Sequence, residues 1–259
     1  MGIFVGIFAY GFGKKLRTGG VTPDKVSAAL ALEQDELGEA SSVPAFRTLA
    51  RLRKLEENVI VWTDCYAALI AKARSMACGL FLDTNDATPA CNQMLLLDED
   101  MDVPADALEE LRRAANQASG RKRIATACVR IGDGSKVSVH PKRIVMSAQH
   151  VHTSADELPT LMKRSPFEVE ATGFACAWMP VECVRRIVST MGRECLFRTG
   201  AVRDGKPLYA PALFLESVQN GEWINEDHAF SMRVRMSRVD LVSVVHPGVV
   251  HDGMRTVTE

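Results

Sequence analysis

The sequence predicts an α/β fold in which helices flank a mostly parallel central sheet. Short apolar runs at 2–10 and 59–64 are rich in β-branched and aromatic residues, whereas 66–82 and 105–117 carry the apolar spacing of helices. Alternation of this kind is typical of βαβ units. We expect one domain over residues 1–259, with 1–115 and 116–259 as its two halves.

The composition is that of an ordinary globular protein. The chain of 259 residues is 47% hydrophobic and has a formal net charge of −1, which gives no global reason to bind nucleic acid or an anionic membrane. The apolar opening lacks a basic start and is too short to span a bilayer, so we expect no stable membrane insertion. Seven cysteines without a CxxC pair indicate reduced thiols and a cytoplasmic protein.

A cluster of acids follows the third apolar run. Residues 94–97 (MLLL) are followed directly by Asp98, Glu99 and Asp100, with Asp102 one residue further on. Pro104 then opens a helix with apolar positions at Ala107, Leu108 and Leu111. The acids therefore lie at the carboxyl end of a buried strand, the edge at which open α/β sheets bind ligands.

The spacing of these acids suits a divalent cation. Alternate residues of an extended segment project to the same side, so Asp98 and Asp100 can face one ion while Glu99 points away. Hard carboxylate oxygens favour Mg²⁺ or Mn²⁺, which take further ligands from water and from substrate phosphates. A solvated acidic turn is the alternative interpretation.

The second half of the chain predicts further strands and helices. Residues 123–131 and 136–147 are β-like, 149–166 is partly helical, 167–180 is extended, and 181–191 is a helix that Gly192 ends. Glycine and proline punctuation at 198–222 predicts a mobile loop. The glycine-rich stretch 11–20 lacks both common phosphate-binding spacings, which favours a flexible connection over a phosphate cradle.

A second acidic pair and two late histidines complete the candidate residues. Glu226 and Asp227 begin a predicted helix whose apolar face carries Phe230 and Val234. Acids at the start of a helix also serve as ordinary capping residues. His246 and His251 follow a terminal strand, and a neutral imidazole there could complete a carboxylate-held metal site. The histidines at 140, 150 and 152 are interpreted as structural.

Taken in chain order, these motifs resemble nucleotide-sugar-dependent glycosyltransferases of the glycosyltransferase-A fold, in particular small family-2-like enzymes of bacteria and phages. The segment Asp98-Glu99-Asp100 fills the DxD motif, and TGF at 172–174, EDHAF at 226–230 and HDG at 251–253 follow in the same order. The stretch 125–144 departs from the family pattern, which leaves the acceptor the least defined part.

The resemblance implies a role for each residue on the donor side. Asp98 and Asp100 would hold Mn²⁺ or Mg²⁺ against the diphosphate of a nucleoside-diphosphate sugar, a UDP-sugar above others, with His251 as a further ligand. Arg74 would face the pyrophosphate and Asp64 the nucleoside. Glu99 would also belong to the nucleotide-sugar site, within the half formed by 1–115.

On the acceptor side, within 116–259, the acidic pair Glu226 and Asp227 would be catalytic. If the enzyme inverts, Asp227 would be the general base that deprotonates an acceptor hydroxyl, on a glycan, a lipid, a protein or a modified DNA base. Two other classes stay open. One is a sugar nucleotidyltransferase, whose usual glycine-rich segment with Arg and Lys after the first strand is partly matched by 11–20. The other is a non-catalytic nucleotide-binding protein.

Overall fold

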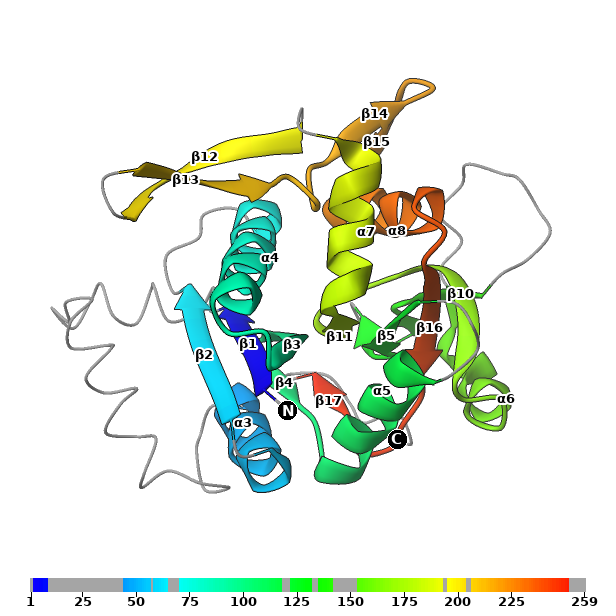
Figure 1. Cartoon of the computed structure of the whole chain (residues 1–259). Helices are drawn as coiled ribbons and strands as arrows, with labels where there is room; N and C mark the ends of the chain where they lie inside the picture. The colour runs from blue at the N-terminus through cyan, green and yellow to red at the C-terminus, as the bar shows by residue number, and fades with distance from the viewer. Residues whose placement is uncertain are drawn as a thin grey trace, which may run out of the picture.

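A mixed central sheet joins strands from both ends of the chain (Figure 1). The computed structural model describes residues 2–8, 44–56, 58–64, 70–117, 122–131, 135–141, 153–192, 195–203 and 206–251. The sheet strands are Gly2–Phe8 (β1), Asn58–Asp64 (β2), Cys91–Asp98 (β3), Arg123–Ala127 (β5), Val139–Pro141 (β8), Phe167–Thr172 (β10), Cys176–Pro180 (β11) and Asp240–Val244 (β16). Within the described residues their order is β2-β1-β3-β11-β5-β16-β10-β8.

Strand direction makes the sheet mixed. β2, β1 and β3 are mutually parallel, and β5 is parallel to β16. β11 is antiparallel to both β3 and β5, and β10 is antiparallel to both β16 and β8. The predicted α/β class is therefore confirmed, but the sheet is mixed and not mostly parallel, because β11 and β10 run against the other strands.

Helices cover both faces of the sheet (Figure 1). They are Pro44–Leu55 (α3), Ile70–Ala87 (α4), Ala105–Asn116 (α5), Leu158–Met162 (α6), Val181–Met191 (α7) and Glu226–Met236 (α8). Met94 and Leu96 of β3 lie in the core formed with α4, α7 and α8, whereas Leu95 and Leu97 lie in the core formed with α3 and α5. The uninterrupted apolar run of β3 follows from this two-sided burial.

The predicted helix faces are confirmed on both sides of the sheet. Ala107, Leu108 and Leu111 of α5 are fully buried, and so are Phe230 and Val234 of α8. Gly192, with a φ of 77°, caps the carboxyl end of α7. The helix expected at 66–82 is described from Ile70 and continues through Ala87, so that most of the polar segment 83–89 is helical.

The segment 198–222, predicted as a loop, contains strands. It holds most of the hairpin of Leu196–Arg203 (β12) with Lys206–Pro211 (β13), and most of that of Ser217–Gln219 (β14) with Glu222–Ile224 (β15). Asn220 and Gly221 between β14 and β15 have φ values of 52° and 82°, as a tight hairpin turn requires. Their Asn-Gly sequence is the signal that the interpretation as a loop overlooked.

Short strand pairs lie beside the main sheet. Met101–Asp102 (β4) pairs with Val250–His251 (β17), and Arg130–Ile131 (β6), Lys136–Val137 (β7) and Thr153–Ser154 (β9) form a small separate sheet. A single 3-10 turn, Ala155–Glu157 (η2), precedes α6. None of the described helices combines the length and apolar character needed to cross a membrane.

Some predictions fall outside the described residues. These are the glycine-rich stretch 11–20, the histidines at 150 and 152, and Gly253 of the HDG motif. Asp64 ends β2, but its side chain is also outside the description.

Candidate active site at the carboxyl edge of the sheet

The site is built on the ends of three parallel strands. Asp98, the last residue of β3, lies in register with Phe8, the last residue of β1, and Phe8 in turn pairs with Asp64 at the end of β2. Because neighbouring strands are about 5 Å apart, the backbones of Asp64 and Asp98 lie roughly 10 Å apart at one edge. The structure thus brings two of the predicted nucleotide-binding residues to the same level of the sheet.

Arg74 of α4 joins the end of β3 to the start of α8. Its Nη2 donates to both carboxylate oxygens of Asp98, at 3.1 and 2.9 Å, and its Nη1 donates to Asp227 Oδ1 at 2.7 Å. The three side chains are mostly buried, with exposed fractions of 3% for Arg74, 14% for Asp98 and 25% for Asp227. Asp98, Arg74 and Asp227 are called the inner cluster.

Charge and burial act against each other in the inner cluster. Burial raises the pKa of the Asp98 carboxyl to about 6, Asp227 and Asp100 add to this rise, and Arg74 opposes it. Burial likewise raises the pKa of Asp227, while Arg74 and a hydrogen bond from the Phe174 backbone N–H lower it. A carboxylate with a raised pKa is better suited to accept a proton near neutral pH.

Aromatic rings complete the surroundings of Arg74, and one of them, Phe214, lies outside every predicted motif. The guanidinium carbon lies 5.7 Å from the centroid of the Phe214 ring, and Phe214 contacts Phe174 and Phe230 at centroid distances of 5.6 and 4.1 Å. Ser75, next to Arg74, accepts a hydrogen bond from the Phe214 backbone N–H at 3.1 Å. Because these residues lie far apart in the chain, no local pattern could have connected them.

The amino end of α8 has a dedicated cap that leaves Asp227 available. Asn225 is the N-cap residue, and its side-chain oxygen accepts the His228 backbone N–H at 3.0 Å. Asp227 and Glu226 occupy the first turn. Asn225 therefore caps the helix, which is the role that the alternative interpretation assigned to the acidic pair. The Asp227 carboxylate instead binds Arg74.

A second group, Asp100 and His251, lies just beyond the inner cluster and is called the outer pair. The pairing of β4 with β17 aligns Met101 with His251, and it places His251 Nε2 3.1 Å from Asp100 Oδ2. The other oxygen, Asp100 Oδ1, is buried and has no hydrogen-bond partner among the described residues. The two predicted ligands, 151 positions apart in the sequence, are thus in contact.

The outer pair fits a divalent cation. A buried carboxylate oxygen without a partner is an available ligand, and the neighbouring imidazole adds a nitrogen donor. The described part of the chain contains no group of three or more His, Cys, Asp or Glu residues that could hold a metal ion by themselves. Mg²⁺ and Mn²⁺ are commonly held by one or two carboxylates together with substrate phosphates, which matches such an incomplete set.

The remaining acids of the run have structural contacts. Asp102 forms ion pairs with Arg47 and Arg51 of α3. The Glu99 backbone N–H donates to the Phe8 carbonyl at 3.0 Å, and its carbonyl accepts the Ala45 N–H at 3.1 Å. These contacts fix the turn that separates Asp98 from Asp100.

The other late histidine lies elsewhere. His246 Nε2 is 3.3 Å from Asp106 of α5, and its Nδ1 accepts the Gly248 N–H at 3.1 Å. Of the two candidate histidines, His251 is the one in contact with the acidic strand end.

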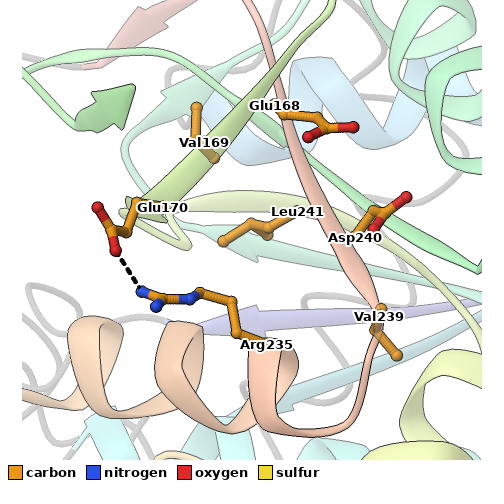
Figure 2. Close-up of a pocket in the computed structure, with 7 residues that line it drawn as sticks. All are labelled: Glu168, Val169, Glu170, Arg235, Val239, Asp240 and Leu241. Carbon is orange, nitrogen blue, oxygen red and sulfur yellow. Dashed lines mark hydrogen bonds and ion pairs between the residues drawn. The ribbon is translucent and has the colours of Figure 1, made fainter. Parts of the chain in front are cut away.

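Figure 2 shows a pocket away from these groups, at the amino end of β16. Since β16 runs in the direction of β3, the first residue of β16, Asp240, lies at the edge opposite Asp98. The pocket includes an exposed ion pair between Arg235 and Glu170 at 2.7 Å. Its lining residues are Glu168, Val169, Glu170, Arg235, Val239, Asp240 and Leu241.

No protein-family model and no curated protein sequence matches the chain. Among solved structures, it is similar to A197 from STIV, with 14% identity, 94% of this chain and 82% of that chain covered, and a TM-score of 0.46. It is similar to a nucleoside-diphosphate-sugar pyrophosphorylase from Vibrio cholerae RC9 at 6% identity, with coverages of 97% and 96% and a TM-score of 0.42. A glycosyltransferase involved in the glycosylation of the major capsid of PBCV-1 is similar at 8% identity, with coverages of 74% and 68% and a TM-score of 0.33.

Proposed function

We propose that the protein is a metal-dependent glycosyltransferase that moves a sugar from a nucleoside-diphosphate sugar to an acceptor hydroxyl. The observation that carries the proposal is the meeting of three separate segments at the carboxyl edge of the sheet. There the acidic end of β3 lies beside Asp227 of α8, through Arg74, and beside His251 of β17. Carboxylates and an imidazole at this edge suit a metal–diphosphate substrate together with a base.

On the donor side, Asp100 and His251 would hold Mn²⁺ or Mg²⁺, with Asp98 beside them. When bound, the ion supplies Lewis-acid stabilisation of the negative charge that gathers on the leaving diphosphate. Asp64, at the same level on β2, would contact the nucleoside, and Glu99 would border the nucleotide. Support comes from the shared strand-end level of Asp64 and Asp98 and from Asp100 Oδ1, which lacks a hydrogen-bond partner within the described ranges.

On the acceptor side, Asp227 would be the general base, with Glu226 next to it. A base must reach the acceptor hydroxyl by a hydrogen bond and must be ionised before it accepts the proton. Asp227 has a quarter of its side chain exposed, and its ion pair with Arg74 favours the ionised form. Proton transfer of this kind contributes about 10² to 10⁴ in rate.

The test is release of nucleotide from a panel of UDP-, GDP-, dTDP-, ADP- and CMP-sugars with Mn²⁺, with EDTA and without added metal. The proposal expects one donor to be turned over in a metal-dependent manner, faster with an acceptor glycan present. Turnover that EDTA leaves unchanged would contradict the metal assignment. Exchange of pyrophosphate into a nucleoside triphosphate would instead identify a sugar nucleotidyltransferase.

A further inference from the structure

The guanidinium of Arg74 has little contact with the space in which a donor would bind. Arg74 as a whole is 2% exposed. Both of its terminal nitrogens donate to carboxylates, Nη1 to Asp227 and Nη2 to Asp98. A phosphate oxygen could take one of these donors only by displacing a carboxylate from a charge-assisted hydrogen bond.

Packing fixes the orientation of this guanidinium. The ring of Phe214 lies 5.7 Å from the guanidinium carbon and belongs to a fully buried cluster with Phe174 and Phe230. The backbone of Phe214 is itself tied to α4 through Ser75. The planar guanidinium of Arg74 has few alternative rotamers against this buried ring. It therefore fixes the positions of the Asp98 and Asp227 carboxylates relative to each other.

The same contacts define where the Asp227 carboxylate points. Arg74 Nη1 donates to Asp227 Oδ1 at 2.7 Å, and the backbone of Phe174 is near enough to lower the pKa of this carboxyl. A Cβ atom at Gly173 would lie 3.6 Å from Asp227 Oδ2, so the backbone before Phe174 approaches this carboxylate closely. Asp227 is thus positioned by α4 and by the segment between β10 and β11, besides its own helix.

We propose that Arg74 is a positioning residue that links the end of β3 to α8 and sets the orientation of Asp227, and that it does not bind the donor diphosphate. This inference rests on the proposed function, in which Asp227 is the base. Removing the guanidinium would misplace Asp227 relative to the acceptor and would leave the nucleotide contacts of the strand ends in place. Transfer would then be lost without a matching loss of donor affinity.

The direct test compares Arg74→Lys and Arg74→Gln with wild type in kcat, donor KM and the dissociation constant of the donor's nucleoside diphosphate with Mn²⁺. A lysine keeps the charge but lacks the planar fork that binds two carboxylates at once. We expect kcat to fall by about 100-fold, as for loss of an orienting contact, with the donor KM and the dissociation constant changed less than about 3-fold. Guanidinium ion, added well below unfolding concentrations, should restore part of the kcat of Arg74→Ala.

The opposite pattern would overturn the proposal. A phosphate-binding arginine contributes charged hydrogen bonds, and its loss would weaken nucleotide binding by about 10- to 150-fold. Arg235→Gln is the matched control, because Arg235 forms an ion pair with Glu170 at the opposite edge of the sheet. Its kcat and KM should equal those of wild type.

A second measurement does not depend on turnover. If Arg74 links Asp98 to Asp227, then Asp227→Asn should shift the urea unfolding midpoint much less when Arg74→Gln is already present than in wild type. Asp98 loses the guanidinium in Arg74→Gln and in the double variant alike, so this cost cancels from the comparison. Arg74→Lys takes the place of Arg74→Gln where the latter does not fold. Additive shifts would refute the link between Arg74 and Asp227. Non-additive shifts in a wild-type protein that turns over no donor would refute the proposed function alone.

Discussion

Asp98 and Asp100 are separated by one residue, yet their carboxylates have different surroundings. Asp98 belongs to the inner cluster, where Arg74 donates to both of its oxygens and a second carboxylate shares the same guanidinium. Asp100 belongs to the outer pair, where a single histidine contacts one oxygen and the other oxygen has no hydrogen-bond partner in the described part of the chain. In the inner cluster both carboxylates are paired with one guanidinium, whereas the outer pair leaves a carboxylate oxygen for a ligand.

Asp102, the last acid of the run, sharpens this contrast. It pairs with Arg47 and Arg51 of α3 and so ties that helix to β4. Three acids at alternate positions therefore differ in their partners: a buried arginine shared with α8, a histidine from β17, and a pair of arginines from α3. The DxD spacing by itself therefore does not assign the same role to each acid.

The largest expected effect is on transfer, at the α8 side of the inner cluster. Asp227→Asn should lower transfer by about 10² to 10⁴, because the amide cannot accept the acceptor's proton, while nucleotide binding stays within a few-fold of wild type. Steady-state kinetics and calorimetry measure the two quantities. Asp106→Asn, in the first turn of α5 and with a mostly exposed side chain, is the matched control. Normal transfer by Asp227→Asn would remove Asp227 from the base role.

The next effect is on stability, at the β3 side of the inner cluster. Asp98→Ala should reduce the free energy of unfolding by about 3 kcal/mol, because it removes one partner from a mostly buried arginine. Asp98→Asn, which keeps an oxygen acceptor, should lose less. Urea unfolding followed by circular dichroism measures both. An unchanged midpoint in Asp98→Ala would show that the inner cluster is not a structural link.

In the outer pair, the expected effect is on Mn²⁺-dependent turnover and not on stability. Asp100→Ala should leave the unfolding midpoint nearly unchanged and reduce Mn²⁺-dependent turnover by about 100-fold, since the ion stabilises the leaving group by several kcal/mol. The control is Asp102→Asn, which should keep Mn²⁺ dependence while losing about 1 kcal/mol of stability from its partly exposed ion pairs. Equal loss of Mn²⁺ dependence in both variants would erase the distinction between Asp100 and Asp102.

The smallest expected effect is at His251. His251→Ala should weaken Mn²⁺ affinity by about 10-fold, because one nitrogen donor is replaced by water while the carboxylate remains. Titration of Mn²⁺ against nucleotide binding measures this affinity. The matched variant is His246→Ala, whose histidine contacts Asp106 and should not change Mn²⁺ affinity. A larger loss in His246→Ala than in His251→Ala would exchange their roles.

Much of the framework could be predicted because it depends on local patterns. The apolar run 94–97 between polar residues indicates a strand buried on both faces, and Pro104 with Leu108 and Leu111 indicates the helix that follows. The spacing of Phe230 and Val234 likewise indicates the buried face of α8. These features require only periodicity and burial, which the sequence carries directly.

The partners of each acid could not be predicted, because they are set by tertiary packing. Arg74 and Asp227 are 153 positions apart, and their contact exists because α4 and α8 lie on the same face of the sheet. The place of Arg74 between two carboxylates likewise depends on where β3 ends. The antiparallel entry of β11 beside β3 had no local signal either, since an apolar strand has the same pattern in both directions.

Whether the strand-end acids form a metal–nucleotide site is tested by melting temperatures. These are measured for wild type and Asp100→Ala with UDP, GDP, CMP, dTDP and ADP, each with and without Mn²⁺. A ligand that binds the native state raises the melting temperature by mass action. We expect one nucleotide to raise the melting temperature of wild type only when Mn²⁺ is present, and we expect Asp100→Ala to lose this rise. Absence of any shift in wild type, or an equal Mn²⁺-dependent shift in Asp100→Ala, would contradict the assignment of the strand-end acids to a metal–nucleotide site.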